Sequence, residues 1–503
     1  MKAIEKIVIL GGGSAGWMTA AMLAKVFSKQ LSITLIESPD IPTVGVGEAT
    51  IPAIQTFNNV LGLDEHVFLK RTQGTYKLGI QFENWGQQGD SYQHAFGDIG
   101  RGLGITPFHH FWLKSNQSKT TQTLWDFSVN AIAANHNKFH PNPQIGKTPL
   151  AGLTYAYHFD AGKYAKLLQE FAIAQGVEYL SGTMESVKLD DNGLIKTLEL
   201  SDEQTIKGDF FIDCSGSSAR LIEQALGVKY QSYQHWLFCD RAIAVQTKPL
   251  KNTPPFTRSI AKDAGWQWQI PLQNRVGNGL VYSSQFMSAE QAEQQLLNSL
   301  ETETITAPKH IKFTPGRREQ QWFKNCLSIG LSSGFLEPLE STSLHLIQTS
   351  IARFIKLFPA HPDCELSAHA YNLQAKNEFE KIRDFIILHY AVNQKQSPFW
   401  QRCGAMTLPD SLQQRIALFK RTGTLSIQAD ELFSEVAWLQ VLIGQGIRPQ
   451  SYHPLARAIS DSELDEFLSN IATIQQQYVT HLPTHEQYLQ RFCRGSELAK
   501  GQI

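Results

Sequence analysis

The strongest constraint on the fold of this chain is a glycine pattern that follows its first apolar segment. Gly11, Gly13 and Gly16 match G-x-G-x-x-G, directly after the apolar run 7–10 and ahead of a helical pattern. The first glycine permits a tight turn, the second lets a pyrophosphate approach the backbone, and the third lets the helix pack on the strand. A second apolar segment at 33–36 completes a β-α-β unit, the context that makes this pattern specific. The sequence therefore predicts a Rossmann-like dinucleotide-binding module.

A carboxylate and a helix start complete the predicted nucleotide site. Glu37 lies 21 residues after Gly16, at the end of the second strand, where ribose hydroxyls can be bound. The helix N-terminus offers N–H groups and a positive dipole end to phosphates. No second G-x-G-x-x-G follows that could bind a nicotinamide nucleotide. A glycine-rich turn without a nucleotide is the alternative interpretation.

The rest of the chain indicates one large α/β assembly. The segments 210–216 and 326–330 are typical of strands that return to the first sheet, residues 244–286 are rich in strand patterns, and helical periodicity dominates from about residue 344. We expect a Rossmann-like core with an inserted β-rich substrate or tunnel region over residues 1–345. Residues 346–503 are expected to be mainly helical and to cover a substrate pocket.

Composition excludes several classes of protein. The net charge is −1, which removes the basic footprint of a nucleic-acid binder. No apolar run approaches the roughly 20 residues that span a bilayer, and Glu5 and Lys6 interrupt the first apolar segment, so neither a membrane span nor a signal peptide is expected. The six cysteines have no C-x-x-C spacing, which favours reduced thiols in a cytoplasmic protein and no metal site.

The segment 265–271 has an unusual alternation of tryptophan and glutamine. In an extended conformation, Trp266, Trp268 and Ile270 point to one face and the glutamines to the other, with Pro271 at the end. Tryptophan is costly to expose, so this face predicts a wall inside the protein. An ordinary core strand is the alternative.

Four motifs together resemble the flavin-dependent tryptophan halogenase family. They are G-x-G-x-x-G-W at 11–17, G-V-G-E-A-T at 45–50, W-x-W-x-I-P at 266–271 and G-F-L-E-P-L-E-S-T at 334–342. The resemblance covers most of the chain up to about residue 350, and it implies an FAD-binding fold. The residues expected at FAD are Gly11, Gly13, Ser14, Ala15, Gly16, Trp17, Glu37, Val46, Gly47, Glu48, Ala49, Thr50, Asp213, Gly330 and Leu331.

The resemblance also implies an activity. Reduced FAD, O2 and chloride or bromide would give hypohalous acid, which halogenates an electron-rich arene. Because no second nucleotide motif is present, we expect a separate NAD(P)H-dependent flavin reductase as a partner that supplies FADH2. The family's wall between flavin and substrate corresponds to Trp266, Trp268, Ile270 and Pro271. A homodimer is a possible assembly, on the general frequency of dimers among enzymes.

The resemblance places the reaction on a lysine and a carboxylate. Lys77 would orient hypohalous acid as a hydrogen-bond donor or form a haloamine as a nucleophile; a solvated surface lysine is the alternative. Glu340 would stabilise the cationic arene and remove its proton, supported by Ser341, unless it is a capping or ion-paired residue. Backbone amides at Thr342 and Ser343 would hold the halide. Many family members have glycine where this chain has Ser343, so backbone restriction puts the halide fit in question.

Substrate residues are expected in two places. His94 and Phe96 resemble the H-x-F positions that sandwich an indole, and Trp438 lies in the region that completes the pocket in tryptophan enzymes. The double tyrosine with which those enzymes bind free tryptophan is missing here, so indole or an indole-like arene is the predicted small-molecule substrate. A flavin-dependent aromatic monooxygenase and a non-catalytic flavin-binding protein are the competing hypotheses.

Overall fold

The computed structural model describes residues 3–40, 47–117, 122–142, 152–362 and 364–494. The chain forms two compact units, each assembled from three segments. The first unit comprises Met1–Thr72, Phe159–Leu237 and Phe313–Glu380, and the second comprises Gln73–His158, Phe238–Lys312 and Lys381–Ile503. The predicted boundary at residue 345 divides the chain by expected function and not by compactness. It stays a prediction.

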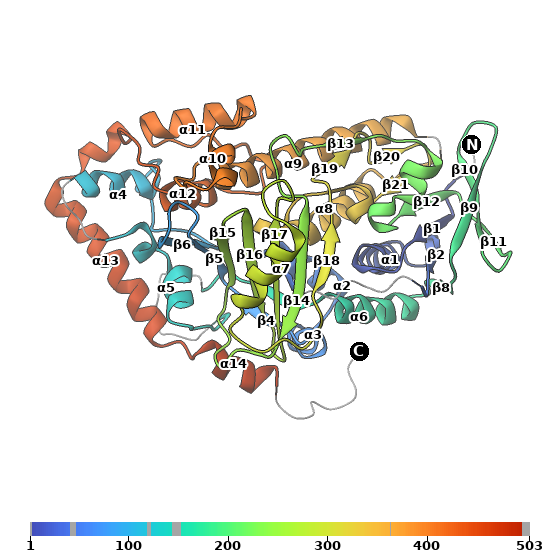
Figure 1. Cartoon of the computed structure of the whole chain (residues 1–503), viewed down its shortest axis with the longest axis horizontal. Helices are drawn as coiled ribbons and strands as arrows, with labels where there is room; N and C mark the ends of the chain where they lie inside the picture. The colour runs from blue at the N-terminus through green and yellow to red at the C-terminus, as the bar shows by residue number, and fades with distance from the viewer. Residues whose placement is uncertain (1–2, 41–46, 118–121, 143–151, 363, 495–503) are drawn as a thin grey trace. The chain divides into compact units, whose positions relative to one another are not determined.

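The first unit is built on a six-stranded sheet in the order β20-β21-β12-β1-β2-β8 (Figure 1). Its strands pair in parallel, except for the antiparallel edge strand β20. The inner strands are apolar along their length because helices and loops cover both faces, as in other parallel sheets. The strands are β1 Lys6–Leu10, β2 Ser32–Glu37, β8 Glu178–Ser181, β12 Phe210–Asp213, β20 Trp322–Phe323 and β21 Cys326–Ser328.

Helix α1, Ser14–Phe27, packs against α6, Ala161–Ala174, and α8, Ser343–Lys356. Its residues from Gly16 to Ala24 are all buried, so α1 is a core helix rather than a surface helix. The remaining helical elements of this unit are η1 Ser28–Gln30, α2 Ala53–Leu61, α3 Glu65–Thr72, η3 Gly216–Ser218, η4 Arg220–Ala225, η5 Gly330–Ser332 and η6 Pro338–Glu340. Its other strands are β3 Gly47–Ala49, β9 Met184–Leu189, β10 Ile195–Leu200, β11 Thr205–Lys207, β13 Tyr230–Ser232, β19 Gly316–Arg318 and β22 Gly334–Phe335.

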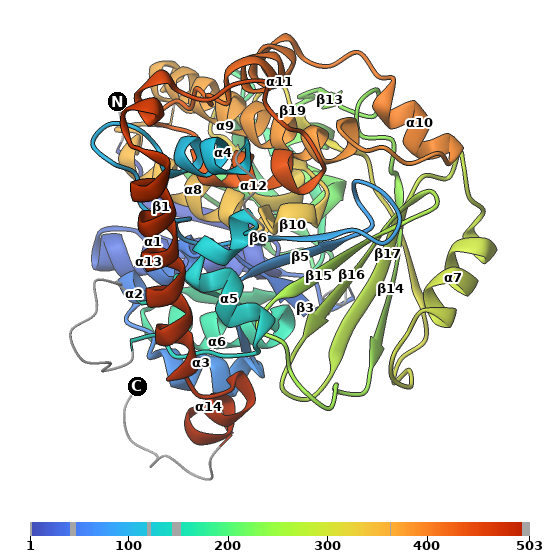
Figure 2. The same ribbon diagram turned by 90° about the vertical axis from the view of Figure 1, so that its left-hand side faces the viewer.

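The second unit contains a seven-stranded sheet in the order β18-β14-β17-β16-β15-β5-β6, and Figure 2 shows its part from β14 to β6. All neighbours are antiparallel except β15 and β5. The strands are β5 Gly79–Glu83, β6 Ser91–Ala95, β14 Arg241–Thr247, β15 Thr257–Lys262, β16 Gly265–Pro271, β17 Val276–Tyr282 and β18 Lys309–Lys312. A short strand β4, Thr75–Lys77, pairs antiparallel with β7, Ala156–Asp160. The predicted β-rich insertion is confirmed.

Helices supply most of the rest of the second unit. Helix α13 contacts α4 and α5, and α7 covers β14 and β17 (Figure 2). The helical elements are α4 Phe108–Gln117, η2 Leu124–Phe127, α5 Val129–Asn135, α7 Ala289–Asn298, α10 Pro398–Gly404, α11 Asp410–Thr422, α12 Glu435–Gly444, η7 Pro454–Ala458, α13 Asp461–Thr480 and α14 His485–Phe492. Helix α9, Glu365–Ala391, runs from the last segment of the first unit into this one.

The described part of the chain has no strand after Phe335, which confirms the predicted helical C-terminal region. None of its helices combines the length and the apolar character needed to cross a membrane.

Candidate active site

The three glycines of the fingerprint have different surroundings. A Cβ on Gly11 would lie 2.2 Å from the carbonyl oxygen of Cys214, and one on Gly16 would lie 1.8 Å from that of Gly11. Gly11 also has a φ of +116°. A Cβ on Gly13 would meet nothing within 4 Å. The fold itself therefore requires Gly11 and Gly16, whereas Gly13 faces open space of the kind that a pyrophosphate fills.

Helix α1 begins beside this space without a side-chain cap. Gly13 is its N-cap residue, which has no side chain to accept a hydrogen bond from the first turn. Ser14, Ala15 and Gly16 follow at the helix start, where N–H groups and the positive end of the helix dipole favour an anion. The backbone therefore fits the dinucleotide that the sequence predicts.

Glu37 lies at the end of β2 and is half-buried. Burial raises the pKa of this carboxyl, and hydrogen bonds from the side chains of Tyr179 and Trp17 lower it. The rings of Trp17 and Tyr179 contact each other, with centroids 5.7 Å apart. Trp17 is buried and thus orients Glu37 rather than lining an open surface.

The predicted G-V-G-E-A-T contacts fall on a short strand and its end. Gly47, Ala49 and Thr50 are buried, and burial raises the pKa of Glu48 to about 7. A carboxyl that is about half protonated at pH 7 adds less negative charge beside a pyrophosphate than an ordinary glutamate does. Val46 lies outside the described residues.

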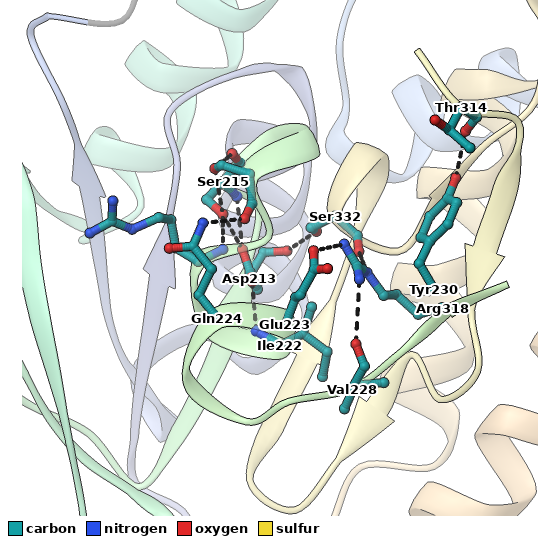
Figure 3. Close-up of polar contacts among 12 residues, drawn as sticks. Asp213, Ser215, Ile222, Glu223, Gln224, Val228, Tyr230, Thr314, Arg318 and Ser332 are labelled. Atoms are coloured by element: carbon teal, nitrogen blue, oxygen red, sulfur yellow. Dashed lines mark hydrogen bonds and ion pairs between the residues drawn. The ribbon is translucent and has the colours of Figure 1, made fainter. Parts of the chain in front are cut away.

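Asp213 is buried at the end of β12, where its carboxylate shapes a turn (Figure 3). One oxygen accepts hydrogen bonds from the Ser215 N–H and hydroxyl, at 3.0 and 2.6 Å. The other accepts from the N–H groups of Leu221 and Ile222, at 2.8 and 2.9 Å. All four contacts are within the protein, so Asp213 organises the loop at the cofactor edge of the sheet rather than presenting a free carboxylate.

Gly330 and Leu331 follow β21 in the same unit. Gly330 has a φ of +77°, and a Cβ there would lie 2.8 Å from the Cβ of Ala15. The structure thus brings Gly330 against the start of α1, next to the glycine fingerprint. Leu331 is exposed, with 49% of its surface accessible, so its side chain is available for contact with a cofactor.

The predicted halide residues lie at the N-terminus of α8. Thr342 is the N-cap residue, yet its side chain makes no capping hydrogen bond, and its buried hydroxyl oxygen has no hydrogen-bond partner among the described residues. A 14-residue helix that starts without a cap presents N–H donors to an anion. Ser343 is the first residue of α8, and its φ is not positive. The serine therefore imposes no backbone strain of this kind, and its part in a halide site stays a prediction.

Glu340 and Ser341 immediately precede the halide residues. Glu340 is 2% exposed and ends η6. Ser341 adopts a left-handed conformation, with a φ of 59°, which turns the chain from η6 into α8. A non-glycine residue in this conformation is uncommon, and such residues cluster at functional sites.

Lys77 ends β4 in the second unit and is completely buried, with 0% exposure. Its ammonium lies 5.4 Å from the ring centroid of Phe96, which is cation–π range. The alternative interpretation as a solvated surface lysine is therefore wrong. Burying a lysine is costly, so this position calls for a specific role.

The W-x-W-x-I-P segment forms β16, and all seven residues are buried. Trp268 lies opposite Gly279 of β17, and its indole occupies the space that a Cβ on Gly279 would need. The Trp266 and Trp268 rings have centroids 6.2 Å apart, and Trp266 also contacts Trp85. The predicted alternation is present, but the glutamine face is buried as well: Gln267 is 1% exposed. Both sides of β16 are therefore packed, as in an ordinary core strand, and the role as a wall stays a prediction.

The predicted substrate residues gather around a phenylalanine of α9. His94 and Trp438 each contact Phe385, with ring centroids 5.7 and 4.9 Å apart. The indole N–H of Trp438 is buried without a hydrogen-bond partner among the described residues, and Arg415 lies 4.2 Å over its ring. Phe96 follows His94 by two residues, and its ring lies beside the Lys77 ammonium. Phe96 thus links these aromatic residues to Lys77.

Gln440 is a site residue that sequence reasoning missed. Its side-chain N–H donates to the carbonyl of Ala95 at 3.0 Å, and its carbonyl accepts from the Ala95 N–H at 2.9 Å. This pair of bonds holds the peptide between His94 and Phe96. The signal available in the sequence was a glutamine inside the apolar segment that forms α12, because an amide buried there must find hydrogen-bond partners. In the structure Gln440 is 1% exposed.

Two surface clefts of the second unit contain none of the predicted site residues. The larger, of about 630 Å³, includes Glu83, Arg258 and Glu301, which form a network of ion pairs. The other, of about 480 Å³, lies beside Trp112 and Arg448. A cleft lined by paired charges is poorly suited to an apolar arene, so the larger cleft does not replace the predicted pocket.

The predicted residues therefore form two groups. The dinucleotide and halide residues, with Glu340 and Ser341, belong to the first unit, and Lys77, the tryptophan wall and the aromatic residues belong to the second.

Comparison with known proteins agrees with this picture. Residues 6–461 match the family model described as tryptophan halogenase. A tryptophan 6-halogenase of Streptomyces toxytricini is 37% identical over 443 residues, covering 83% of this chain and 84% of the relative. Among solved structures, a flavin-dependent halogenase from Xanthomonas campestris is 44% identical with a TM-score of 0.94, covering 98% of this chain and 99% of the other. BrvH, a flavin-dependent halogenase from a Brevundimonas species, is 40% identical with a TM-score of 0.94, covering 97% and 99%.

Proposed function

Because the chain belongs to the tryptophan halogenase family, we propose that it uses FADH2, O2 and chloride or bromide to halogenate indole or an indole-like arene. The observation that carries the proposal is the fully buried Lys77 beside the ring of Phe96. A monooxygenase has no need for a buried ammonium at the substrate, whereas transfer of an electrophilic halogen does.

The first unit supplies the cofactor and halide sites. Open space at Gly13 and the uncapped start of α1 support binding of the FAD pyrophosphate, and Glu37 is placed for a ribose. When bound, reduced FAD would supply two electrons that bring O2 to the peroxide level, at which an oxygen atom oxidises the halide. The uncapped N-terminus of α8 at Thr342 and Ser343 holds that halide. A separate NAD(P)H-dependent reductase delivers the reduced flavin, since the sequence contains one nucleotide fingerprint.

Lys77 controls the hypohalous acid that results. Its ammonium orients the acid by donating a hydrogen bond, or its amine takes the halogen as a haloamine; both routes place the halogen beside the arene. In the first route, the arene carbon bonds the halogen as the halogen–oxygen bond breaks, and the released hydroxide takes a proton from the Lys77 ammonium and leaves as water. In the second route, water leaves when the nitrogen–halogen bond forms, and that bond then breaks as the arene carbon takes the halogen. Glu340 accepts the proton that the ring carbon loses, which restores aromaticity. The packed wall at Trp266 and Trp268 prevents direct oxygen transfer to the arene.

The aromatic residues of the second unit favour a flat, electron-rich substrate. His94, Phe96 and Trp438 offer ring faces and edges, and stacking needs no charged group on the substrate. The names of several relatives specify tryptophan as their substrate. This chain lacks the double tyrosine expected for the amino acid group, so we propose indole or a substituted indole instead.

Product analysis by mass spectrometry tests the proposal. The purified protein is mixed with a flavin reductase, FAD, NADH, O2 and either chloride or bromide, together with indole, substituted indoles, tryptophan and phenols. The expected result is a halogen isotope pattern on an indole. Hydroxylated product without halogen would move the protein to the aromatic monooxygenases, and FAD binding without any product would favour a non-catalytic flavoprotein.

A further inference from the structure

One buried histidine of the second unit joins the strand of Lys77 to the tryptophan wall. His158 lies on β7 directly opposite Thr75 of β4, two residues before Lys77. It is 0% exposed. Its Nδ1 is 3.0 Å from the Thr75 hydroxyl, and its Nε2 is 2.8 Å from the Thr257 hydroxyl on β15. The Thr75 hydroxyl in turn donates to the carbonyl of Pro271, at 2.7 Å.

The hydroxyl protons fix the direction of this chain of bonds. A carbonyl can only accept, so the single proton of the Thr75 hydroxyl points to Pro271. Toward His158, Thr75 is then an acceptor, and Nδ1 must carry a proton. In a neutral imidazole the other nitrogen, Nε2, is an acceptor, and it accepts a hydrogen bond from the Thr257 hydroxyl. The path runs from Thr257 through His158 and Thr75 to Pro271 with every polar atom satisfied.

The surroundings keep the imidazole neutral. Burial lowers the pKa of His158 well below its ordinary value, and the charges of Lys77 and His485 lower it further. A protonated His158 would lose the bond from Thr257 and would add a cation beside Lys77. The neutral form is therefore the one that preserves the path.

We infer that His158, as its neutral Nδ1–H tautomer, is a positioning residue for Lys77, holding β4 in register with the end of the tryptophan wall. It touches neither substrate nor cofactor and acts through Thr75. The inference rests on the proposed function of Lys77. An ammonium displaced by about 1 Å from the path of hypohalous acid can lose on the order of 100-fold in rate, so the register of a three-residue strand matters.

Two substitutions of His158 separate its two bonds. In His158→Asn the side-chain amide occupies the place of Nδ1 and keeps the donor to Thr75. In His158→Gln the amide occupies the place of Nε2, keeping the contact with Thr257 and losing the one with Thr75. The measured quantity is the capture fraction, which is halogenated arene formed per halide oxidised, with escaped hypohalous acid collected by an added β-diketone. We expect the capture fraction to fall about tenfold in His158→Gln and by less than about threefold in His158→Asn.

Equal capture fractions in the two variants would overturn the inference. If His158 served only the stability of the fold, its loss would lower the amount of folded enzyme. The fraction of oxidised halide that folded enzyme transfers to the arene would not change. Wild-type protein and Lys77→Met are assayed alongside. Failure of the wild type to halogenate, or full activity of Lys77→Met, would count against the proposed function, whereas the His158 comparison decides the inference itself. If His158→Gln does not fold, Thr75→Val and Thr75→Ser make the same comparison: only serine keeps the hydroxyl, and only valine should lose capture.

A second readout is independent of activity. The protein contains 16 histidines, and the ¹⁵N imidazole signals missing from His158→Asn identify those of His158. The expected spectrum shows a protonated Nδ1 and an unprotonated Nε2. An Nε2–H tautomer, or a doubly protonated ring, would contradict the inference.

Discussion

In the proposed function, the two units of this protein build functional sites in opposite ways. In the first unit the binding groups are mainly backbone: the open space at Gly13 and the uncapped starts of α1 and α8 offer N–H groups to anions. In the second unit they are buried side chains from distant segments, with Lys77 beside Phe96 and Gln440 on the peptide of Ala95. A site built from backbone groups tolerates many changes of side chain, but an atom added where the ligand lies disrupts it. A site built from side chains depends on single functional groups. Five predictions test this contrast.

The largest effect is expected at Lys77. Lys77→Met keeps the length and burial of the side chain but removes its nitrogen, so halogenated product should fall by at least about 1,000-fold while FAD binding persists. Product is measured by mass spectrometry and FAD binding by flavin fluorescence. Lys251→Met, at an exposed site of the same unit, is the matched control and should keep full activity. Product from Lys77→Met at the control level would remove Lys77 from the mechanism.

Two glycine substitutions distinguish a backbone site from a backbone fold. Gly13→Ala adds a methyl that meets no protein atom, so the melting temperature should hold while FAD affinity falls on the order of 100-fold, equal to about 2.8 kcal/mol. Gly16→Ala forces a methyl against the Gly11 carbonyl and should destabilise the protein by about 3 kcal/mol. Calorimetry and FAD titration measure both. Unchanged FAD affinity in Gly13→Ala would place the pyrophosphate elsewhere.

The carboxyl of Glu48 should make stability pH-dependent. Burial raises its pKa from 4.5 to about 7, so the folded protein holds this proton more tightly than the unfolded chain does. Stability from this group is therefore present at low pH and is lost as the pH rises through about 7. Glu48→Gln cannot ionise, and its free energy of unfolding relative to wild type should increase by about 2 kcal/mol from pH 5 to pH 7.5. Glu185→Gln, at an exposed position, is the control, and a parallel pH dependence in both variants would contradict the prediction.

In the second unit, Gln440 should matter through the peptide that it holds. Gln440→Leu leaves the Ala95 N–H and carbonyl without these partners and should cost about 2–4 kcal/mol of stability. Displacement of His94 and Phe96 should raise the substrate KM about tenfold. Gln445→Leu removes another buried amide of the same unit, whose side chain donates to the Tyr92 hydroxyl in the described part of the chain, and should leave KM unchanged. An equal KM in both variants would mean that Gln440 serves stability alone.

The smallest effect is expected at Thr342, because the backbone provides most of the halide site. Thr342→Val removes a buried hydroxyl that has no partner among the described residues, so stability should hold or rise while the halide KM increases about threefold. Thr349→Val, on the same helix, breaks a hydrogen bond to Glu378 and should lower stability without changing the halide KM. A halide KM that rises by orders of magnitude in Thr342→Val would show that the side chain, not the backbone, binds the halide.

The same contrast explains what the sequence could predict. The glycine fingerprint, Glu37 and the start of α8 lie in short continuous motifs, because backbone donors come from neighbouring residues; the Rossmann-like sheet and the β-rich insertion follow from equally local patterns. Burial of the glutamine face of β16 could not be predicted, since alternation alone does not reveal what packs on the second face. Gln440 and His158 act on strands far away in the sequence, and only the fold brings them there. The role of Asp213 as the organiser of a turn also depends on four N–H and O–H donors that no motif identifies.

The most direct test of this division of work follows the oxidised halide in Lys77→Met. Protein, flavin reductase, FAD, NADH, O2, bromide and indole are combined with a β-diketone that traps free hypobromous acid, and both brominated products are quantified. If the first unit oxidises halide and Lys77 transfers it, the variant should brominate the trap at the wild-type rate of halide oxidation while brominated indole disappears. Loss of both products in a variant that still binds FAD would contradict the account, because Lys77 would then be needed for halide oxidation itself.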